Sequence, residues 1–172
     1  MKTAGESGFA SAERVDHLRS LTIGELPEWG HQQGLELLDL IKSPAEGFPC
    51  TFAVRGALTD SLRFGFVDEL YDRRQWRDLR SILSEYLKIY QDISRETSLL
   101  VFFDTEHADD DLDGYFKTFW DMLQYLHDED GVQWPAEIPH DPQDPMWAFT
   151  FEGTPMFVVC CTPAHVKRRS RS

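Results

Sequence analysis

The sequence is poor in cysteine and has no long hydrophobic run. Its three cysteines, two of them adjacent, do not make the evenly paired set that staples a small secreted domain, and the first residues do not resemble a signal peptide. We therefore expect a cytoplasmic protein. Because no apolar run approaches the roughly 20 residues that span a bilayer, we also expect a soluble protein with no membrane partner.

Basic residues are scarce as well. Lys and Arg number 17 against 30 Asp and Glu, for a formal net charge of -13. Four of the 17 bases lie between Lys167 and Arg171, so residues 1–166 carry 13 bases against 30 acids. Binding to nucleic acid needs clustered Lys and Arg, so the sequence argues against a nucleic-acid partner. The acidic body is expected instead to attract cationic small molecules.

The common sequence motifs of several enzyme classes are missing. The sequence has no Gly-rich phosphate loop, no nucleophile elbow and no His-Glu-x-x-His pair. These absences argue against the commonest classes of nucleotide-binding protein and hydrolase.

What the chain does contain is enough apolar material for one core. At 172 residues, with 41% apolar and 13% aromatic residues, it has the usual size of one domain. We predict a flexible N-terminus over residues 1–12, a single domain over residues 13–166 and a basic tail over residues 167–172.

Apolar side chains repeat at spacings of three and four in two segments, which predicts two amphipathic helices. The first covers residues 75–93 and the second covers residues 112–126, with Asp109, Asp110 and Asp111 offering an N-cap. Residues 31–42 predict a shorter helix. The apolar stripes assigned to the core are Trp76, Leu79, Leu83, Tyr86, Tyr90 and Ile93 in the first helix, and Leu112, Tyr115, Phe116, Phe119, Trp120, Leu123 and Leu126 in the second.

Short apolar runs bounded by turn residues predict the strands. Thr51–Arg55 and Leu62–Val67 suggest a hairpin, and Ser98–Phe103 suggests a central strand covered on both faces. Met146–Phe151 and Met156–Cys161 suggest a second hairpin.

Between these elements, four prolines in residues 134–145 exclude regular helix. Because strands and helices alternate irregularly, we predict an α+β fold with a mixed, largely antiparallel sheet and packed helices, rather than a doubly wound parallel sheet.

Three cysteines and one histidine are the candidate metal ligands. Cys160 and Cys161 are neighbours on a predicted strand, so their side chains should point to opposite faces and cannot easily share one tetrahedral site. A set of Cys50, His165 and one of these thiols does not match the spacing of known zinc motifs. Cys50, after Phe48-Pro49, is either a thiolate ligand or a buried small hydrophobe.

The C-terminal residues offer further alternatives. His165 follows a turn and is an iron ligand, a residue that orients a carboxylate, or a surface histidine. The bases from Lys167 to Arg171 either pair with carboxylates or phosphates, or form a frayed tail.

An ordered set of short segments between residues 35 and 172 resembles the YqcI/YcgG family. The segments are Phe48-Pro49-Cys50, Leu62–Val67, Ser98–Phe103, Phe119-Trp120, Leu123–His127, Trp134-Pro135, Ile138-Pro139, Asp144-Pro145, Met156–Cys160 and Thr162–Val166. The family includes heme-dependent N-hydroxylases that oxidise guanidine nitrogens. Two departures are that Cys161 stands where family members usually carry Asn, and that members continue beyond the end of this chain, which suggests a C-terminally shortened member.

The resemblance implies a heme b cofactor, which needs an axial ligand, an apolar slot and cations for its propionates. Cys50 is the first choice for the axial ligand, His165 the second and Cys160 the third. The candidates for the propionates are Arg55, Arg63, Arg168 and Arg169. The candidates for the slot are Phe52, Phe64, Phe66, Phe157 and Trp147.

The expected activity is that of a cytoplasmic heme-dependent monooxygenase that N-hydroxylates a guanidine-containing amino acid or a related amine. Its electrons would come from an unidentified reductase or a reduced nicotinamide. Asp68, Glu69 and Glu152 are candidates to bind the substrate guanidinium. Two alternatives stay open: a non-catalytic heme carrier or sensor, and a plain interaction domain whose basic tail docks an acidic partner.

Overall fold

The computed structural model describes residues 4–43, 51–104 and 110–164, and for residues 4–11, 51 and 52 it describes the backbone alone. The chain divides into two compact units, Met1–His107 and Ala108–Ser172. Helices and short strands occur in both units, so the predicted α+β class is confirmed. The assignment of residues 13–166 to a single domain stays a prediction.

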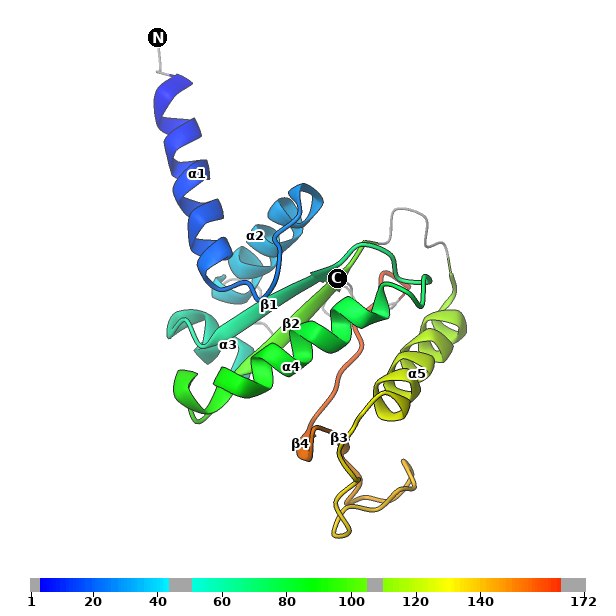
Figure 1. Cartoon of the computed structure of the whole chain (residues 1–172). Coiled ribbons are helices and arrows are strands. Elements are labelled where there is room, and N and C mark those ends of the chain that lie inside the picture. Colours follow the sequence, from blue (N-terminus) through cyan, green and yellow to red (C-terminus); the bar gives the residue numbers. More distant parts are fainter. Residues whose placement is uncertain (1–3, 44–50, 105–109, 165–172) are drawn as a thin grey trace. The chain divides into compact units, whose positions relative to one another are not determined.

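The first unit is built around a pair of parallel strands (Figure 1). Its elements are α1 (Ala4–Ser20), α2 (Glu28–Lys42), α3 (Thr51–Leu58), β1 (Leu62–Val67), α4 (Trp76–Ile93) and β2 (Ser98–Phe103). The chain leaves β1, returns through α4 and enters β2 in the same direction, since parallel strands need a crossover of this kind. On the other edge of β1, Thr22 pairs with Phe64, so β1 is an interior strand.

The core of the first unit lies around β1. Phe64 is fully buried and stacks on Phe102 with ring centroids 6.2 Å apart, and Phe66 stacks on the same ring at 5.4 Å. From α4, the buried residues are Trp76, Leu79, Ile82, Leu83 and Tyr86, which confirms most of the stripe predicted for this helix.

Two strand predictions in the first unit need correction. Thr51–Arg55 does not form a strand, because it belongs to α3. The buried residues of this helix are the small Ala53, Gly56 and Ala57, and a Cβ on Gly56 would lie 2.6 Å from Leu62 Cδ2. The helix thus packs closely against β1, and this packing overrides the local strand preference. Ser98–Phe103 is a strand as predicted, but every residue in it is half-buried rather than covered on both faces.

The N-terminal helices extend further than the sequence predicts. The structure has α1 from Ala4, where the sequence predicts a flexible end, and α2 begins at Glu28 rather than at residue 31. The hydrophobic periodicity of α1 is weak, so its sequence pattern carries little helical signal.

The second unit contains α5 (Leu112–Asp128) and an antiparallel hairpin of β3 (Phe149–Phe151) and β4 (Thr154–Met156). The predicted N-cap is confirmed, because the Asp111 carboxylate accepts a hydrogen bond of 2.9 Å from the Gly114 N–H. Glu152 and Gly153 turn the hairpin with φ of 49° and 71°, the left-handed pair that a tight two-residue turn requires. A hairpin occurs in the predicted region, and β3 lies within the predicted Met146–Phe151. The second strand was predicted wrongly as Met156–Cys161, because the chain turns within two residues and β4 therefore covers Thr154–Met156.

The stripe predicted for α5 is only partly in the core. Tyr115, Leu123 and Leu126 are buried, but the side chains of Leu112 and Phe116 are 47% and 59% exposed. The prediction was wrong for these two residues. Periodicity identifies the apolar face of a helix, but not whether another element covers all of it.

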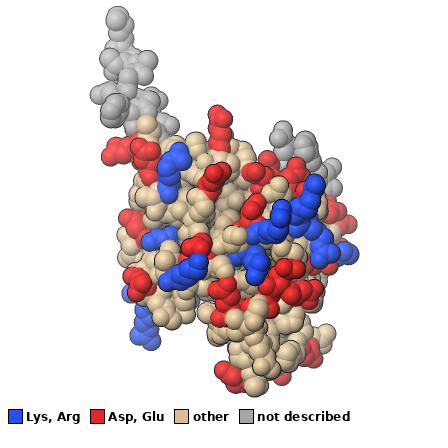
Figure 2. All heavy atoms as spheres, in the orientation of Figure 1, with Lys and Arg blue, Asp and Glu red and all other residues tan. Residues whose placement is uncertain are grey.

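The surface charge is uneven within the first unit. Figure 2 shows Lys and Arg gathered over the N-terminal end of α4, where Arg73, Arg74, Arg77 and Arg80 are exposed. Arg74 pairs with the Asp72 carboxylate at 2.8 Å, and the Arg73 guanidinium lies 5.4 Å from the centre of the Trp76 ring. Among the described helices, none is long and apolar enough to cross a bilayer.

Candidate functional site

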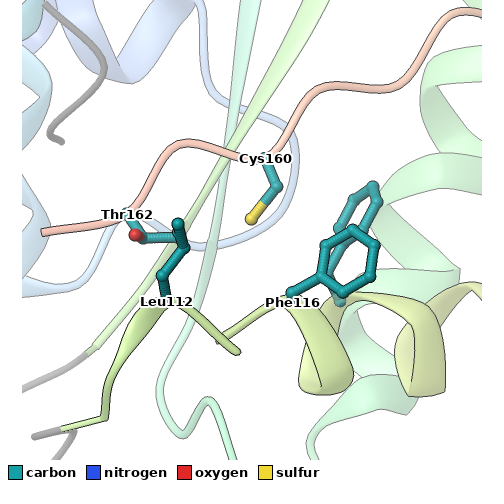
Figure 3. Close-up of a pocket in the computed structure, with 5 residues that line it drawn as sticks. Leu112, Phe116, Cys160 and Thr162 are labelled. Carbon is teal, nitrogen blue, oxygen red and sulfur yellow. The ribbon is translucent and has the colours of Figure 1, made fainter. Parts of the chain in front are cut away.

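A small apolar pocket in the second unit contains one of the predicted ligand residues. Three side chains of α5 line it, those of Leu112, Phe116 and Phe119, and Cys160 and Thr162 complete the wall. Its volume is about 230 Å³. Figure 3 shows the Cys160 sulfur pointing into the space between Leu112 and Phe116.

The position of Cys160 follows from a strand-like alternation after β4. Phe157 and Val159 are 92% and 66% exposed, whereas Val158 and Cys160 are half-buried. This period of two places Cys160 in the pocket and Cys161 on the exposed side. The prediction that the two adjacent thiols face opposite sides is therefore confirmed.

The environment of Cys160 changes its acidity. Burial raises the pKa of its thiol above the ordinary value, and the neighbouring Cys161 thiol adds to this by charge repulsion. In the absence of a metal, Cys160 is a neutral thiol near neutral pH. It can become a thiolate ligand only by giving up its proton when a metal binds.

Two of the arginines predicted to bind the heme propionates, Arg55 and Arg63, lie in the described part of the chain. Arg55 is exposed on α3 and pairs with Glu96 at 3.0 Å. Arg63 lies on β1 and donates hydrogen bonds to the carbonyl oxygens of Asp60 and Leu62, at 2.9 and 2.7 Å. Both belong to the first unit, while Cys160 belongs to the second.

Several predicted site residues lie outside the described part of the chain: Cys50, His165, Arg168 and Arg169. The side chain of Phe52 is also outside it. Their assignments stay predictions.

The aromatic residues proposed for a heme slot separate into core and surface. Phe64 and Phe66 are buried in the core of the first unit, so neither lines an open slot there. In the second unit, Trp147 is half-buried against Trp120 at 5.8 Å, and Phe157 is almost fully exposed.

The pocket fits only part of a heme site. A sulfur donor beside aromatic rings is suitable chemistry for a heme iron. However, 230 Å³ is below the roughly 300–1,000 Å³ of typical small-molecule sites, and the basic residue of α5, Lys117, is paired with Asp121 at 2.6 Å. Within the described residues, no group of three His, Cys, Asp or Glu is placed to hold a metal ion.

A carboxylate and an aromatic side chain form a hydrogen bond at the carboxyl end of strand β1. Asp68 follows β1 directly, and its carboxylate accepts a hydrogen bond of 2.9 Å from the Trp29 indole N–H. Asp104 follows β2, and its backbone N–H donates to the Val67 carbonyl at 3.0 Å. Acidic residues thus follow both strands at their carboxyl ends, where open α/β sheets commonly bind ligands.

Trp29 is the member of this arrangement that sequence reasoning missed. It is half-buried at the start of α2 and packs edge-on against Phe66 at 5.6 Å. Nothing in its sequence neighbourhood points to Asp68, which lies 39 residues further along the chain. Glu69 is exposed beside Asp68, and Glu152 lies in the turn between β3 and β4 of the second unit.

A second cavity, of about 320 Å³, lies in the first unit between α1 and α2. Leu35 and Leu38 form its apolar part, and Arg14 and Asp39 close an ion pair of 2.6 Å at its wall. None of the predicted site residues lines this cavity.

Comparison with protein-family models gives one decisive match. The model of the YqcI/YcgG family matches residues 37–172, which is most of the chain. The chain belongs to the YqcI/YcgG family. The predicted resemblance is therefore confirmed.

Three proteins are similar to the chain in sequence. The YcgG protein of Bacillus subtilis (strain 168) is 39% identical over 153 residues, covering 86% of this chain and 60% of YcgG. The YqcI protein of the same organism is 35% identical over 150 residues, covering 86% of this chain and 59% of YqcI.

The third relative is DcsA of Streptomyces lavendulae, whose name gives it provisionally as an N(omega)-hydroxy-L-arginine synthase. It is 29% identical over 168 residues, covering 94% of this chain and 62% of DcsA. The chain thus spans about three fifths of the length of these relatives. No solved structure matches it significantly.

Proposed function

We propose that this chain carries an N-hydroxylating oxidoreductase activity toward a guanidine-containing amino acid or a related amine. The observation that carries the proposal is the similarity to DcsA, which extends over 94% of the chain. In the proposed reaction, one atom of O₂ is inserted at a substrate nitrogen and the other leaves as water. A reductant supplies the two electrons, and two protons complete the balance.

We propose heme b as the cofactor, since it would supply O₂ activation when bound. Cys50, His165 and Cys160 are the candidate axial ligands, in that order. For Cys160, support comes from its place in an apolar pocket beside Phe116 and Phe119. Arg55, Arg63, Arg168 and Arg169 remain the proposed partners of the propionates.

For the substrate, Asp68 and Trp29 are the best supported residues. A guanidinium group binds to carboxylates through paired hydrogen bonds and stacks on aromatic rings. The hydrogen bond of 2.9 Å between Asp68 and Trp29 brings these two chemistries together at the carboxyl end of β1. Glu69 and Glu152 are the other candidate carboxylates.

The first test of the proposal is a hemin titration of the purified chain followed by visible absorbance. A saturable shift of the Soret band is expected. No saturable shift with the folded protein would reject the heme proposal. A Cys160→Ser variant should be compared with Cys161→Ser, because the second thiol lies on the exposed side and serves as the matched control.

The second test measures turnover. The heme-loaded protein is supplied with O₂, a chemical reductant and L-arginine, and the product is analysed by mass spectrometry. A product that has gained one oxygen atom on the guanidine group is expected. Heme binding without any product from L-arginine or other guanidines and amines would instead favour a carrier or sensor. Absence of heme binding would favour a plain interaction domain.

A further inference from the structure

The cavity between α1 and α2 is formed entirely within the first unit, by two neighbouring helices (Figure 1). Leu18 of α1 belongs to the buried core of this unit, and a Cβ on Gly34 of α2 would lie 2.7 Å from Leu18 Cδ2. The helices approach this closely because Gly34 has no side chain. Both walls of the cavity are therefore fixed by contacts inside one unit.

The lining of the cavity combines an apolar part with charges of both signs. Leu35 and Leu38 supply the apolar part from α2. The volume of about 320 Å³ is at the low end of the roughly 300–1,000 Å³ of small-molecule sites. Such a cavity suits a small ligand that has both an apolar group and charged groups. The other lining residues are Glu13, Arg14 and His17 from α1, and Asp39 and Lys42 from α2.

An ion pair joins the two walls of the cavity. Arg14 Nη2 on α1 lies 2.6 Å from Asp39 Oδ1 on α2, and the two side chains are 50% and 66% exposed. An ion pair with this much contact with water contributes little to stability, because solvent screens the attraction and two long side chains must be held in one geometry. A ligand can therefore replace either partner at a small cost in free energy.

The ion pair also selects the charge of the ligand. An anion that took Arg14 would leave the Asp39 carboxylate without its partner, and a cation that took Asp39 would do the same to Arg14. A zwitterion replaces both partners at once, so no charge is left unpaired. Among the described residues, neither Glu13 nor Lys42 forms an ion pair, so these two side chains add a second carboxylate and a second cation for the same ligand groups.

We propose that this cavity binds the zwitterion of a free amino acid with an apolar side chain. The ligand carboxylate binds to Arg14 in place of Asp39, and the ligand ammonium group binds to Asp39. The apolar side chain of the ligand lies against Leu35 and Leu38, where its removal from water favours binding. The proposal does not depend on the N-hydroxylation proposed above, because none of the residues proposed for that reaction lines this cavity.

The test is isothermal titration calorimetry of the intact chain with L-leucine. Saturable binding at a one-to-one ratio is expected. Three related compounds each remove one feature of the ligand: 4-methylpentanoate lacks the ammonium group, leucinol lacks the carboxylate and glycine lacks the apolar side chain. Each should bind at least about tenfold more weakly, since each loses a charged hydrogen-bond partner or the apolar contact.

Two variants assign the binding of L-leucine to this cavity. Arg14→Gln and Asp39→Asn should each weaken it at least about tenfold, because each removes a charge that pairs with the ligand. The matched controls are Arg19→Gln on α1 and Glu36→Gln on α2, which change charged residues outside the cavity and should leave the affinity unchanged. All four side chains are exposed, so the fold should tolerate the changes, as circular dichroism would check.

Three results would overturn the proposal. The first is the absence of saturable binding of L-leucine and of other apolar amino acids. The second is binding of 4-methylpentanoate or leucinol as tight as that of L-leucine, since the cavity would then recognise only one charge. The third is binding of L-leucine that neither Arg14→Gln nor Asp39→Asn weakens, which would place the site elsewhere in the chain.

Discussion

Asp130 and Glu152 are 22 residues apart in the sequence and are joined by a hydrogen bond of 2.9 Å from the Glu152 backbone N–H to Asp130 Oδ2. The other carboxylate oxygen, Oδ1, accepts from the Val132 N–H, also at 2.9 Å. One side chain thus ties the end of α5 to the turn of the β3–β4 hairpin. Because the pocket lies between α5 and the segment after β4, Asp130 helps to hold both of its walls.

Asp130→Ala should therefore destabilise the protein by about 1–2 kcal/mol, since two backbone N–H groups lose a charged acceptor. The measurement is urea unfolding followed by circular dichroism. The matched control is Asp128→Ala, which removes an exposed carboxylate bound to the Gln124 side chain and should cost less than about 0.5 kcal/mol. An equal loss of unfolding free energy in the two variants would show that the hydrogen bonds accepted by Asp130 contribute little to stability.

Gly65→Ala should cost about 1–3 kcal/mol through overpacking. A Cβ at this position would lie 2.6 Å from Ile82 Cγ2, and Ile82 is buried where α4 packs on β1. Thermal unfolding gives the comparison with Gly131→Ala, where a Cβ would meet nothing within 4 Å. If both variants unfold at the same temperature, Ile82 can move aside at little cost.

Cys160 should react with iodoacetamide more slowly than Cys161 in a Cys50→Ser background. Burial raises the pKa of the Cys160 thiol, so less of the reactive thiolate is present at a given pH, and the side chain is also less accessible. Peptide mass spectrometry after timed labelling measures both rates. Faster labelling of Cys160 would contradict the pocket environment.

The raised pKa of the Cys160 thiol also predicts that the free energy of unfolding depends on pH. A thiol whose pKa is higher in the folded than in the unfolded protein favours folding in its protonated form. Its contribution is complete below the unfolded pKa and is lost as the pH rises through the folded pKa. Stability of the wild-type protein should therefore fall more steeply in this alkaline range than that of Cys160→Ala, as unfolding curves at successive pH values would measure.

Asp68→Asn should raise the KM for L-arginine at least about tenfold with a smaller effect on kcat, because a guanidinium loses a charged partner in its binding site. Steady-state kinetics of the heme-loaded protein provides the measurement, with Glu69→Gln as the neighbouring carboxylate control. The folding of Asp68→Asn should be preserved, since the amide oxygen can still accept from Trp29. A KM that rises only in Glu69→Gln would move the substrate site to that residue.

The long helices were predictable because their signal is local. In α4, Trp76, Leu79, Leu83 and Tyr86 recur at the helical period, and all four are buried. A turn after Phe151 was equally local, since a left-handed conformation favours glycine, although the predicted connection over residues 152–155 is longer than the observed turn at Glu152-Gly153. Because Cys160 and Cys161 are neighbours in a segment predicted to be extended, the sequence also predicted that their side chains point to opposite faces.

Other features depended on contacts between distant residues. α3 is a helix because small side chains allow it to approach Leu62, and that approach is invisible in a segment that contains Thr51 and Val54. The exposure of Phe116 depends on what covers α5, and the pairing of Trp29 with Asp68 depends on where α2 packs.

Periodicity and turn chemistry in the sequence alone thus determined most elements and the opposite directions of the adjacent thiols. Only the tertiary structure decided that β1 and β2 run parallel and that the Trp29 indole donates to the Asp68 carboxylate. The physical reason is that a residue's local preference acts over a few neighbours, whereas pairing and burial depend on which distant segments occupy the remaining space.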